Sequence, residues 1–296
     1  MRGTHPERAL EQSIEREGAL RHGERILIAC SGGADSVGLA AILGAIAKPL
    51  NLSLTIAHVN HGRRASAWQD EAIVLRTGAA LGIPVRVTAP PVAGDGEAAM
   101  RDARYDALAA MARECEASTV AVGHTAEDQT ETVLLALFRG TGPRGVAGMP
   151  ARRSLEEGVD LVRPLLRCTR ADVVSYVQFA ALPYAVDPSN ANLKYRRNAL
   201  REALDGLRPL FPGLDEAVAR AAFLAGEEGR TGSAAARREQ IRAALSEHGA
   251  LEGVDFGHVA QAVRAMERGR SGRFHMAPGV ALSIDGGRLT VHREGR

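Results

Sequence analysis

One short segment constrains the fold more than any other part of the chain. Residues 25–30 form an apolar run, residues 37–47 form a second one, and between them lie Ser31, Gly32, Gly33, Ala34, Asp35 and Ser36. This order predicts a buried strand, a tight glycine turn and the start of a helix. The amides and the positive dipole end of a helix start attract anions, so we interpret the turn as a phosphate site. Ser31 and Ser36 add hydroxyl groups to it, and Asp35 adds a carboxylate that suits a cation.

The same alternation of strands and helices continues through the first half of the chain. Further strands are predicted at residues 52–58, 84–88, 119–122 and 159–162, and further helices at residues 68–81, 97–116, 126–139 and 171–179. Regular alternation indicates an α/β protein with a doubly wound parallel sheet and right-handed crossovers. With the common strand order 3-2-1-4-5, the loops at residues 31–36 and 123–128 flank the crevice in which such sheets bind ligands.

The pattern changes after Pro183. A basic helix is predicted within residues 194–208, and a hinge at residues 209–213, where the sequence is Pro-Leu-Phe-Pro-Gly. Beyond it we expect helix over residues 214–247 and short strands at residues 273–277, 280–284 and 288–292. We therefore predict a catalytic domain at residues 1–208 and a small α+β or mainly helical domain at residues 214–296.

Composition excludes several classes of protein. No run of about 18 apolar residues occurs, so no membrane span is expected, and the polar start of the chain favours a cytoplasmic protein. The three cysteines, Cys30, Cys115 and Cys168, are far apart, which argues against a zinc site, an iron–sulfur site or a disulfide framework. The net charge of +2 does not by itself demand a nucleic-acid partner.

A second polar segment begins at Gly123 and His124 and precedes a long apolar run. Thr125 is placed as the N-cap of a helix with Asp128 at its third position, which predicts a capping box. Asp128 and Glu131 are three residues apart and point to the same side of that helix. Two carboxylates at the crevice suit Mg²⁺ or a cationic substrate.

These motifs together resemble those of a known family. The turn at residues 31–36 resembles the SGGxDS loop of the PP-loop ATP pyrophosphatases, and residues 123–149 resemble a signature of the tRNA(Ile)-lysidine synthetases. Residues 58–66, 97–105, 163–166 and 187–190, with Arg197, Asn198 and Arg201, also match that family in the right order. The similarity covers roughly residues 22–205, and Glu127 stands where the family usually has Asp.

The resemblance implies a PP-loop fold of the adenine nucleotide α-hydrolase type and an ATP-dependent carbon–nitrogen ligase that forms AMP and pyrophosphate. Such an enzyme joins L-lysine to C2 of the wobble cytidine in a tRNA(Ile) with a CAU anticodon. ATP and Mg²⁺ are then the expected cofactors, and tRNA(Ile) and L-lysine the expected partners. The domain at residues 214–296 would assist tRNA binding, and a homodimer stays open.

The resemblance also assigns roles to residues. The catalytic residues are Asp35, Asp128 and Glu131, with Asp35 as the Mg²⁺ ligand and the other two binding the lysine ammonium. The nucleotide contacts are residues 31–36 with Asn60, Gly123 and His124. The tRNA or substrate contacts are Arg101, Arg104, Arg139, Arg144, Arg197 and Arg201. Solvated helix faces or local ion pairs are the simpler alternative for Arg101, Arg104, Arg197 and Arg201.

Two other functions remain open. One is another PP-loop enzyme, either a tRNA thiolase or an amide-forming synthetase, although the scattered cysteines do not favour thiolation. The other is a nucleotide- or RNA-binding protein that has lost catalysis. The intact turn at residues 31–36 and the presence of Asp128 favour an enzyme over this last class.

Overall fold

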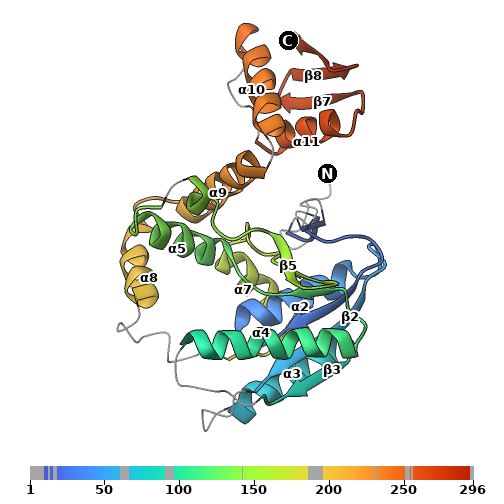
Figure 1. Ribbon diagram of the computed structural model, residues 1–296, viewed down its shortest axis with the longest axis vertical. Helices are drawn as coiled ribbons and strands as arrows, with labels where there is room; N and C mark the ends of the chain where they lie inside the picture. Colours follow the sequence, from blue (N-terminus) through green and yellow to red (C-terminus); the bar gives the residue numbers. More distant parts are fainter. Residues whose placement is uncertain are drawn as a thin grey trace. The chain divides into compact units, whose positions relative to one another are not determined.

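A six-stranded sheet forms the centre of the first of two units into which the chain divides, Met1–Phe223 and Leu224–Arg296. The computed structural model describes residues 10–12, 14–15, 19–60, 67–90, 97–141, 143–185, 196–230, 232–250, 254 and 256–293. The sheet order is β3-β2-β1-β4-β6-β5, and Figure 1 labels β2, β3 and β5 of this sheet. The strands are β1 (Arg25–Ala29), β2 (Ser53–Val59), β3 (Val85–Thr88), β4 (Thr119–Ala121), β5 (Arg152–Glu156) and β6 (Val159–Val162).

All strands of this sheet pair in parallel except β5, which runs antiparallel to β6. The doubly wound fold and the expected strand order are thus confirmed, with β6 as the fifth predicted strand. The edge strand β5 was not predicted, because its sequence is Arg-Arg-Ser-Leu-Glu and carries no apolar alternation. The strand pairs with β6, and Leu155 packs on the second core. Ion pairs add to this: Arg152 contacts Glu24 at 2.5 Å and Asp160 at 2.6 Å.

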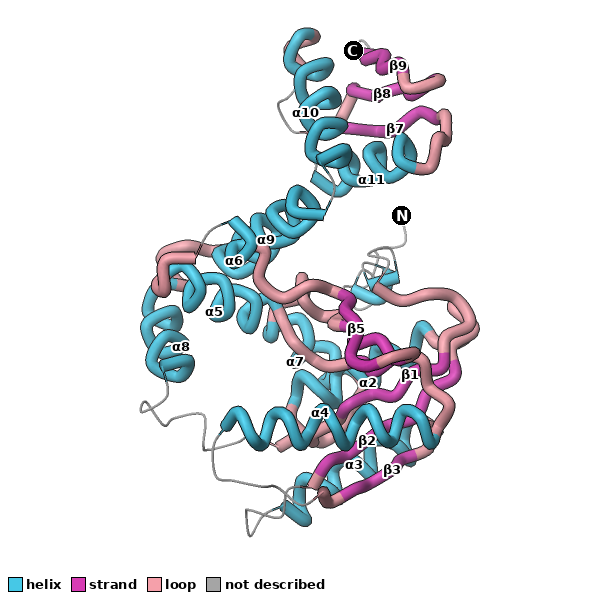
Figure 2. Tube along the Cα trace, in the orientation of Figure 1, coloured by secondary structure: helices cyan, strands magenta, loops and turns pink. Residues whose placement is uncertain are grey.

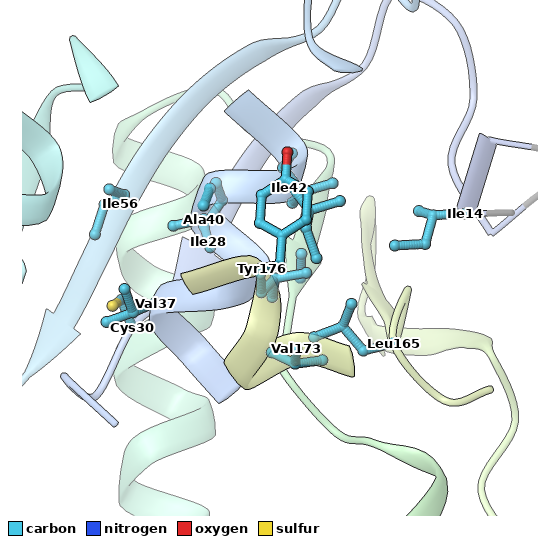
Figure 3. Close-up of a cluster of buried hydrophobic side chains, with 14 of the residues drawn as sticks. Ile14, Ile28, Cys30, Val37, Ala40, Ile42, Ile56, Leu165, Val173 and Tyr176 are labelled. Carbon is cyan, nitrogen blue, oxygen red and sulfur yellow. The ribbon is translucent and has the colours of Figure 1, made fainter. Parts of the chain in front are cut away.

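Helices cover both faces of the sheet, because β1 sends alternate side chains to opposite sides. Ile26 and Ile28 pack with α2 (Ala34–Ile46), α3 (Ala67–Leu81) and α7 (Arg170–Phe179) on one face. Leu27 packs with α4 (Glu97–Glu114) on the other face. Figure 3 shows part of the first core, in which Ile42 of α2 lies near Tyr176 of α7 and Val37 lies beside Cys30.

Three further helices complete the first unit near the carboxyl edge of the sheet. They are α5 (Ala126–Leu137), the short α6 (Pro143–Val146) and α8 (Arg196–Leu207). Helix α8 packs beside α5 (Figure 2), and α6 also contacts α5. Consequently, α5 is held by two helices that follow it in the sequence, α6 and α8.

The second unit combines helices with a small antiparallel sheet, as the α+β alternative expected. Helix α9 (Leu214–Arg230) crosses the division between the units, and α10 (Gly232–Glu247) and α11 (Phe256–Glu267) follow. The meander β7 (Gly272–Ala277), β8 (Val280–Asp285) and β9 (Arg288–Arg293) matches the three predicted strands. The helix expected over residues 214–247 is two helices, and the boundary expected at residues 209–213 stays a prediction.

None of the helices that the structure describes combines the length and the apolar character that crossing a membrane requires.

Close helix packing makes one glycine of α2 sensitive to substitution. A Cβ at Gly38 would lie 2.3 Å from Cγ1 of Val173, and this β-branched side chain in a helix has little rotamer freedom. We expect Gly38→Ala to lower the free energy of unfolding of the first unit by about 1–2 kcal/mol despite the better helix propensity of Ala. Urea unfolding measures the change.

Gly206→Ala in α8 is the matched control, because a Cβ there would have no atom within 4 Å. This variant is expected to raise stability by about 0.5–1 kcal/mol. Equal effects of the two substitutions would contradict the close packing of α2 against α7.

Candidate active site

The turn after β1 leaves the start of α2 open. Ser36 organises this turn: its Oγ accepts a hydrogen bond from the amide of Ser31 at 3.1 Å and donates one to the carbonyl of Gly33 at 2.9 Å. Gly32 has a φ of 92°, a left-handed conformation that glycine adopts without strain. Gly33 is the N-cap and brings no capping side chain. The first turn of α2 therefore offers its backbone to an anion without a side chain of its own in the way.

The loop after β4 lies directly against this turn. A Cβ added to Gly123 would come within 2.8 Å of the carbonyl oxygen of Asp35 and 3.3 Å of the Cα of Ser36. Such an approach requires glycine, because the obstructing atoms belong to backbone. The two loops that were expected to flank the crevice are thus in contact.

Asp35 has two differently placed carboxylate oxygens. Oδ2 accepts a hydrogen bond from Nε of Arg170 at 3.1 Å, whereas Oδ1 is buried and has no partner among the described residues. Burial raises the pKa of Asp35, and the positive charge of Arg170 opposes this rise. A buried carboxylate oxygen without a donor is costly, and a cation would relieve that cost.

The donor set around Asp35 fits Mg²⁺. Within the described part of the chain, no group of three or more His, Cys, Asp or Glu side chains is arranged to hold a metal. A cation at Asp35 would therefore take its other ligands from water and phosphate oxygens. Mg²⁺ commonly binds in this manner, through one or two carboxylates and a nucleotide.

Asp128 uses one carboxylate oxygen to cap its own helix and the other to contact α8. Its Oδ2 accepts the amide of Thr125 at 3.0 Å, which forms the capping box expected from the sequence. Its Oδ1 lies 3.2 Å from Nη2 of Arg197 on α8. Burial alone would raise the pKa of Asp128, but the amide of Thr125 and the surrounding positive charge hold it below its ordinary value. Asp128 is therefore ionised at neutral pH.

Glu131 is fully buried beside Asp128 on α5. Its Oε2 accepts a hydrogen bond from Nε of Arg197 at 2.5 Å, and its Oε1 accepts one from Nε of Arg201 at 2.7 Å. These two arginines come from α8, more than sixty residues later in the sequence. In this arrangement Glu131 anchors α8 to α5 and fixes the arginines around Asp128.

Glu127 joins α5 to α7. Its carboxylate oxygens accept the backbone amide of Arg170, the first residue of α7, at 2.8 and 3.0 Å. A carboxylate at a helix N-terminus also interacts favourably with the helix dipole. Glu127 therefore holds the helix that carries Arg170.

His124 belongs to the loop after β4 and contacts Arg163, which directly follows β6. Nε of Arg163 donates to Nδ1 of His124 at 3.2 Å, and Arg163 is itself held by the carbonyl of Pro150 at 2.7 Å. Burial lowers the pKa of His124 to about 4. The imidazole is thus neutral at pH 7, and with Nδ1 accepting it carries its proton on Nε2.

The other expected site residues are more scattered. Asn60 donates to Glu71 at 3.0 Å, and the guanidinium of Arg101 lies over the ring of Tyr105 at 5.3 Å. Arg104 and Arg139 are exposed. The side chain of Arg144 and the motifs at residues 61–66 and 187–190 lie outside the described residues.

The chain is fixed to α5 directly after the glycine-rich segment at residues 140–148. The side-chain amide of Gln129 donates to the carbonyl of Met149 at 3.0 Å and accepts the amide of Met149 at 2.8 Å. Gly148 has a φ of 59°, and a Cβ there would meet Gln129 at 2.8 Å. The glycine-rich segment thus ends at a fixed point on α5.

The sequence patterns predicted no functional role for Arg163 or for Arg170. Arg163 stands in the matched Arg-Pro-Leu-Leu motif, so a signal for it was present. Arg170 follows the N-cap Thr169, and its position suggests only a helix start. Its contact with Asp35, 135 residues away, has no local sequence signal.

Comparisons with known proteins agree with this geometry. A model of the PP-loop domain matches residues 3–206. A tRNA(Ile)-lysidine synthase of Salinispora tropica is 44% identical over 205 residues, which cover 67% of this chain and 61% of the relative. Another, of a Synechococcus species, is 36% identical over 220 residues, covering 74% of this chain and 68% of the relative. The chain thus spans about six tenths of the length of the Salinispora relative.

Among solved structures, a U34-tRNA thiolase of Methanococcus maripaludis with its [4Fe-4S] cluster matches with a TM-score of 0.62. It shares 18% sequence identity, and the match covers 75% of this chain and 78% of that one, so it shows the fold alone. The fold, the open helix start and the sequence matches lead to one conclusion: the chain belongs to the PP-loop family and, within it, to the family of the tRNA(Ile)-lysidine synthases.

Proposed function

We propose that the protein joins L-lysine to C2 of the wobble cytidine in a tRNA(Ile) with a CAU anticodon. In the first step the C2 oxygen attacks the α-phosphate of ATP, so that an oxygen–phosphorus bond forms and pyrophosphate leaves. In the second step the ε-amine of lysine forms a bond to C2, and the carbon–oxygen bond breaks to release AMP. The open helix start next to the unpartnered Oδ1 of Asp35 carries this proposal, because it suits a nucleotide with a cation.

The turn at residues 31–36 binds the pyrophosphate end of ATP in this proposal. Backbone amides of α2 and the hydroxyl of the exposed Ser31 stabilise the charge that grows on the leaving group. Asp35 holds Mg²⁺, which when bound neutralises phosphate charge. The neutral His124 donates from Nε2 to a phosphate or base oxygen, and Gly123 keeps the two loops in contact.

Asp128 is the better placed of the two acids of α5 for contact with lysine. Its side chain is 13% exposed, whereas that of Glu131 is 0% exposed and binds two guanidinium groups. We assign Asp128 to the ammonium group of the lysine substrate. Because this group has a pKa of about 10.4, it is protonated at neutral pH and must lose a proton before its nitrogen can attack C2. Glu131 contributes by holding Arg197 and Arg201, and thereby keeps Asp128 in place.

The tRNA contacts belong to the same proposal. The exposed Arg101, Arg104 and Arg139 suit phosphate groups of the tRNA. We assign the same role to Arg144, which stands within the glycine-rich segment at residues 140–148. Arg197 and Arg201 would reach tRNA only by exchanging their contacts with Asp128 and Glu131. We also propose that residues 214–296 assist tRNA binding and that the protein works in the cytoplasm. Whether it forms a homodimer is tested by sedimentation.

A direct assay tests the function. The protein is incubated with ATP, L-lysine and tRNA(Ile) bearing CAU, and the nucleosides are then analysed by mass spectrometry. A cytidine heavier by lysine less water supports the proposal. In a parallel incubation with a sulfide donor in place of lysine, incorporation of sulfur would support the thiolase alternative. An unchanged tRNA with no pyrophosphate release in either incubation would support a binding protein.

Replacing Asp128 with Asn separates catalysis from nucleotide binding. We expect lysidine formation to fall by about a hundredfold or more, because the carboxylate that binds and deprotonates the amine is lost. ATP binding, measured by calorimetry, should change little.

Asp172→Asn is the matched control. Asp172 forms the equivalent capping box with Thr169 on α7, and its side chain is exposed, so its substitution reproduces the loss of the cap without removing a buried carboxylate. Similar activities of the two variants would rule out the assignment of Asp128.

Gly123→Ala tests the contact between the two loops. The added Cβ presses on the carbonyl of Asp35, so the first turn of α2 must shift. We expect the affinity for α,β-methylene-ATP to fall about tenfold or more, since small misplacements of binding groups are costly. Gly206→Ala provides the control, and an affinity equal to that of the wild type would contradict the role of the contact.

A further inference from the structure

We propose that Arg170 is a positioning residue for Asp35: it occupies one carboxylate oxygen and leaves the other available to the nucleotide-bound cation. This inference rests on the proposed function in so far as Asp35 binds the cation. It concerns a residue outside the turn and outside the segment at residues 123–131.

The two oxygens of Asp35 are the first observation. Oδ2 accepts a hydrogen bond from Nε of Arg170 at 3.1 Å, and Oδ1 is buried without a partner among the described residues. Binding of a cation through both oxygens would compete with the hydrogen bond from Arg170 to Oδ2, whereas binding through Oδ1 alone would keep it. Arg170 therefore fixes which oxygen faces the ligand.

Arg170 is itself held in place by its backbone. Glu127 accepts the amide of Arg170 with both carboxylate oxygens, and the carbonyl of Cys168 accepts the amide of Ala126 at 2.9 Å. The starts of α5 and α7 are thus joined by two independent contacts. The contact from Arg170 to Asp35 then connects both helices to the start of α2.

Charge explains why an arginine is needed here. Asp128 and Glu127 place two further negative charges near Asp35, and the guanidinium of Arg170 is a positive charge among them. The guanidinium donates through Nε in a fixed plane, which an ammonium group does not reproduce. The longer side chain of Glu127, where the family usually has Asp, is the group that reaches the amide of Arg170 in this chain.

Metal binding gives the direct test. Mn²⁺ is titrated into the protein with saturating α,β-methylene-ATP, and the free ion is measured by electron paramagnetic resonance. We expect Arg170→Gln to weaken Mn²⁺ binding about tenfold or more, as is typical for the loss of a group that orients a metal ligand. The affinity for the nucleotide without metal should stay within about threefold, and Arg170→Lys should recover part of the lost metal affinity.

A double-mutant cycle with Asp35→Asn isolates the coupling. If Arg170 acts through Asp35, the double variant binds Mn²⁺ as weakly as Asp35→Asn alone. Additive losses would overturn the proposal, as would a large loss of metal-free nucleotide affinity, which would show that Arg170 contacts phosphate itself. Should Arg170→Gln fail to fold, Arg170→Lys serves in the same cycle.

Arg152→Gln controls for the general loss of an ion pair. Arg152 binds Glu24 and Asp160 at the amino end of the sheet, away from the nucleotide turn. We expect this variant to lose stability while it binds Mn²⁺ like the wild type, and equal losses in both variants would overturn the proposal. The binding measurement does not depend on the tRNA reaction. If the wild type binds Mn²⁺ and nucleotide but forms no lysidine, the proposed function is refuted, and the role of Arg170 in metal binding can still be tested.

Discussion

The contact between Gly123 and the first turn of α2 determines how the site is built. Because a Cβ at Gly123 would lie 2.8 Å from a backbone oxygen, the loop after β4 and the loop after β1 form one surface. This contact places the start of α5 next to the start of α2. Glu127 accepts a hydrogen bond from the first amide of α7, so three helix N-termini meet at the carboxyl edge of the sheet. Asp35, Glu127, Asp128 and Arg170 all lie in the first turns of these three helices.

Much of this arrangement could be predicted from the sequence, because it depends on local patterns. The apolar run before Ser31 and the glycines after it define a strand, a turn and a helix in consecutive residues. The capping box of Thr125 and Asp128 spans only four residues, and the sheet order follows from the regular alternation of elements. Each of these features involves neighbours in sequence, or a topology with few alternatives.

Contacts that join distant parts of the chain could not be predicted. Arg197 and Arg201 read as a basic helix face, and only the folded chain shows that their partners are Asp128 and Glu131. The edge strand β5 was missed for a related reason, since Arg152 is held by carboxylates on other elements rather than by an apolar face. The contact between Asp35 and Arg170 is also an ion pair between distant parts of the chain. Ion pairs carry no periodic signal, so sequence indicates the charges but not their partners.

Gln129 has a consequence for how the segment before Met149 tolerates change. Its side-chain amide imitates a peptide group, because it satisfies both the donor and the acceptor of one residue of the main chain. The chain therefore enters β5 from a point fixed by α5 and not by the preceding loop. Residues between Phe138 and Gly148 can thus vary in number or composition without disturbing the sheet, provided that Gly148 keeps its conformation.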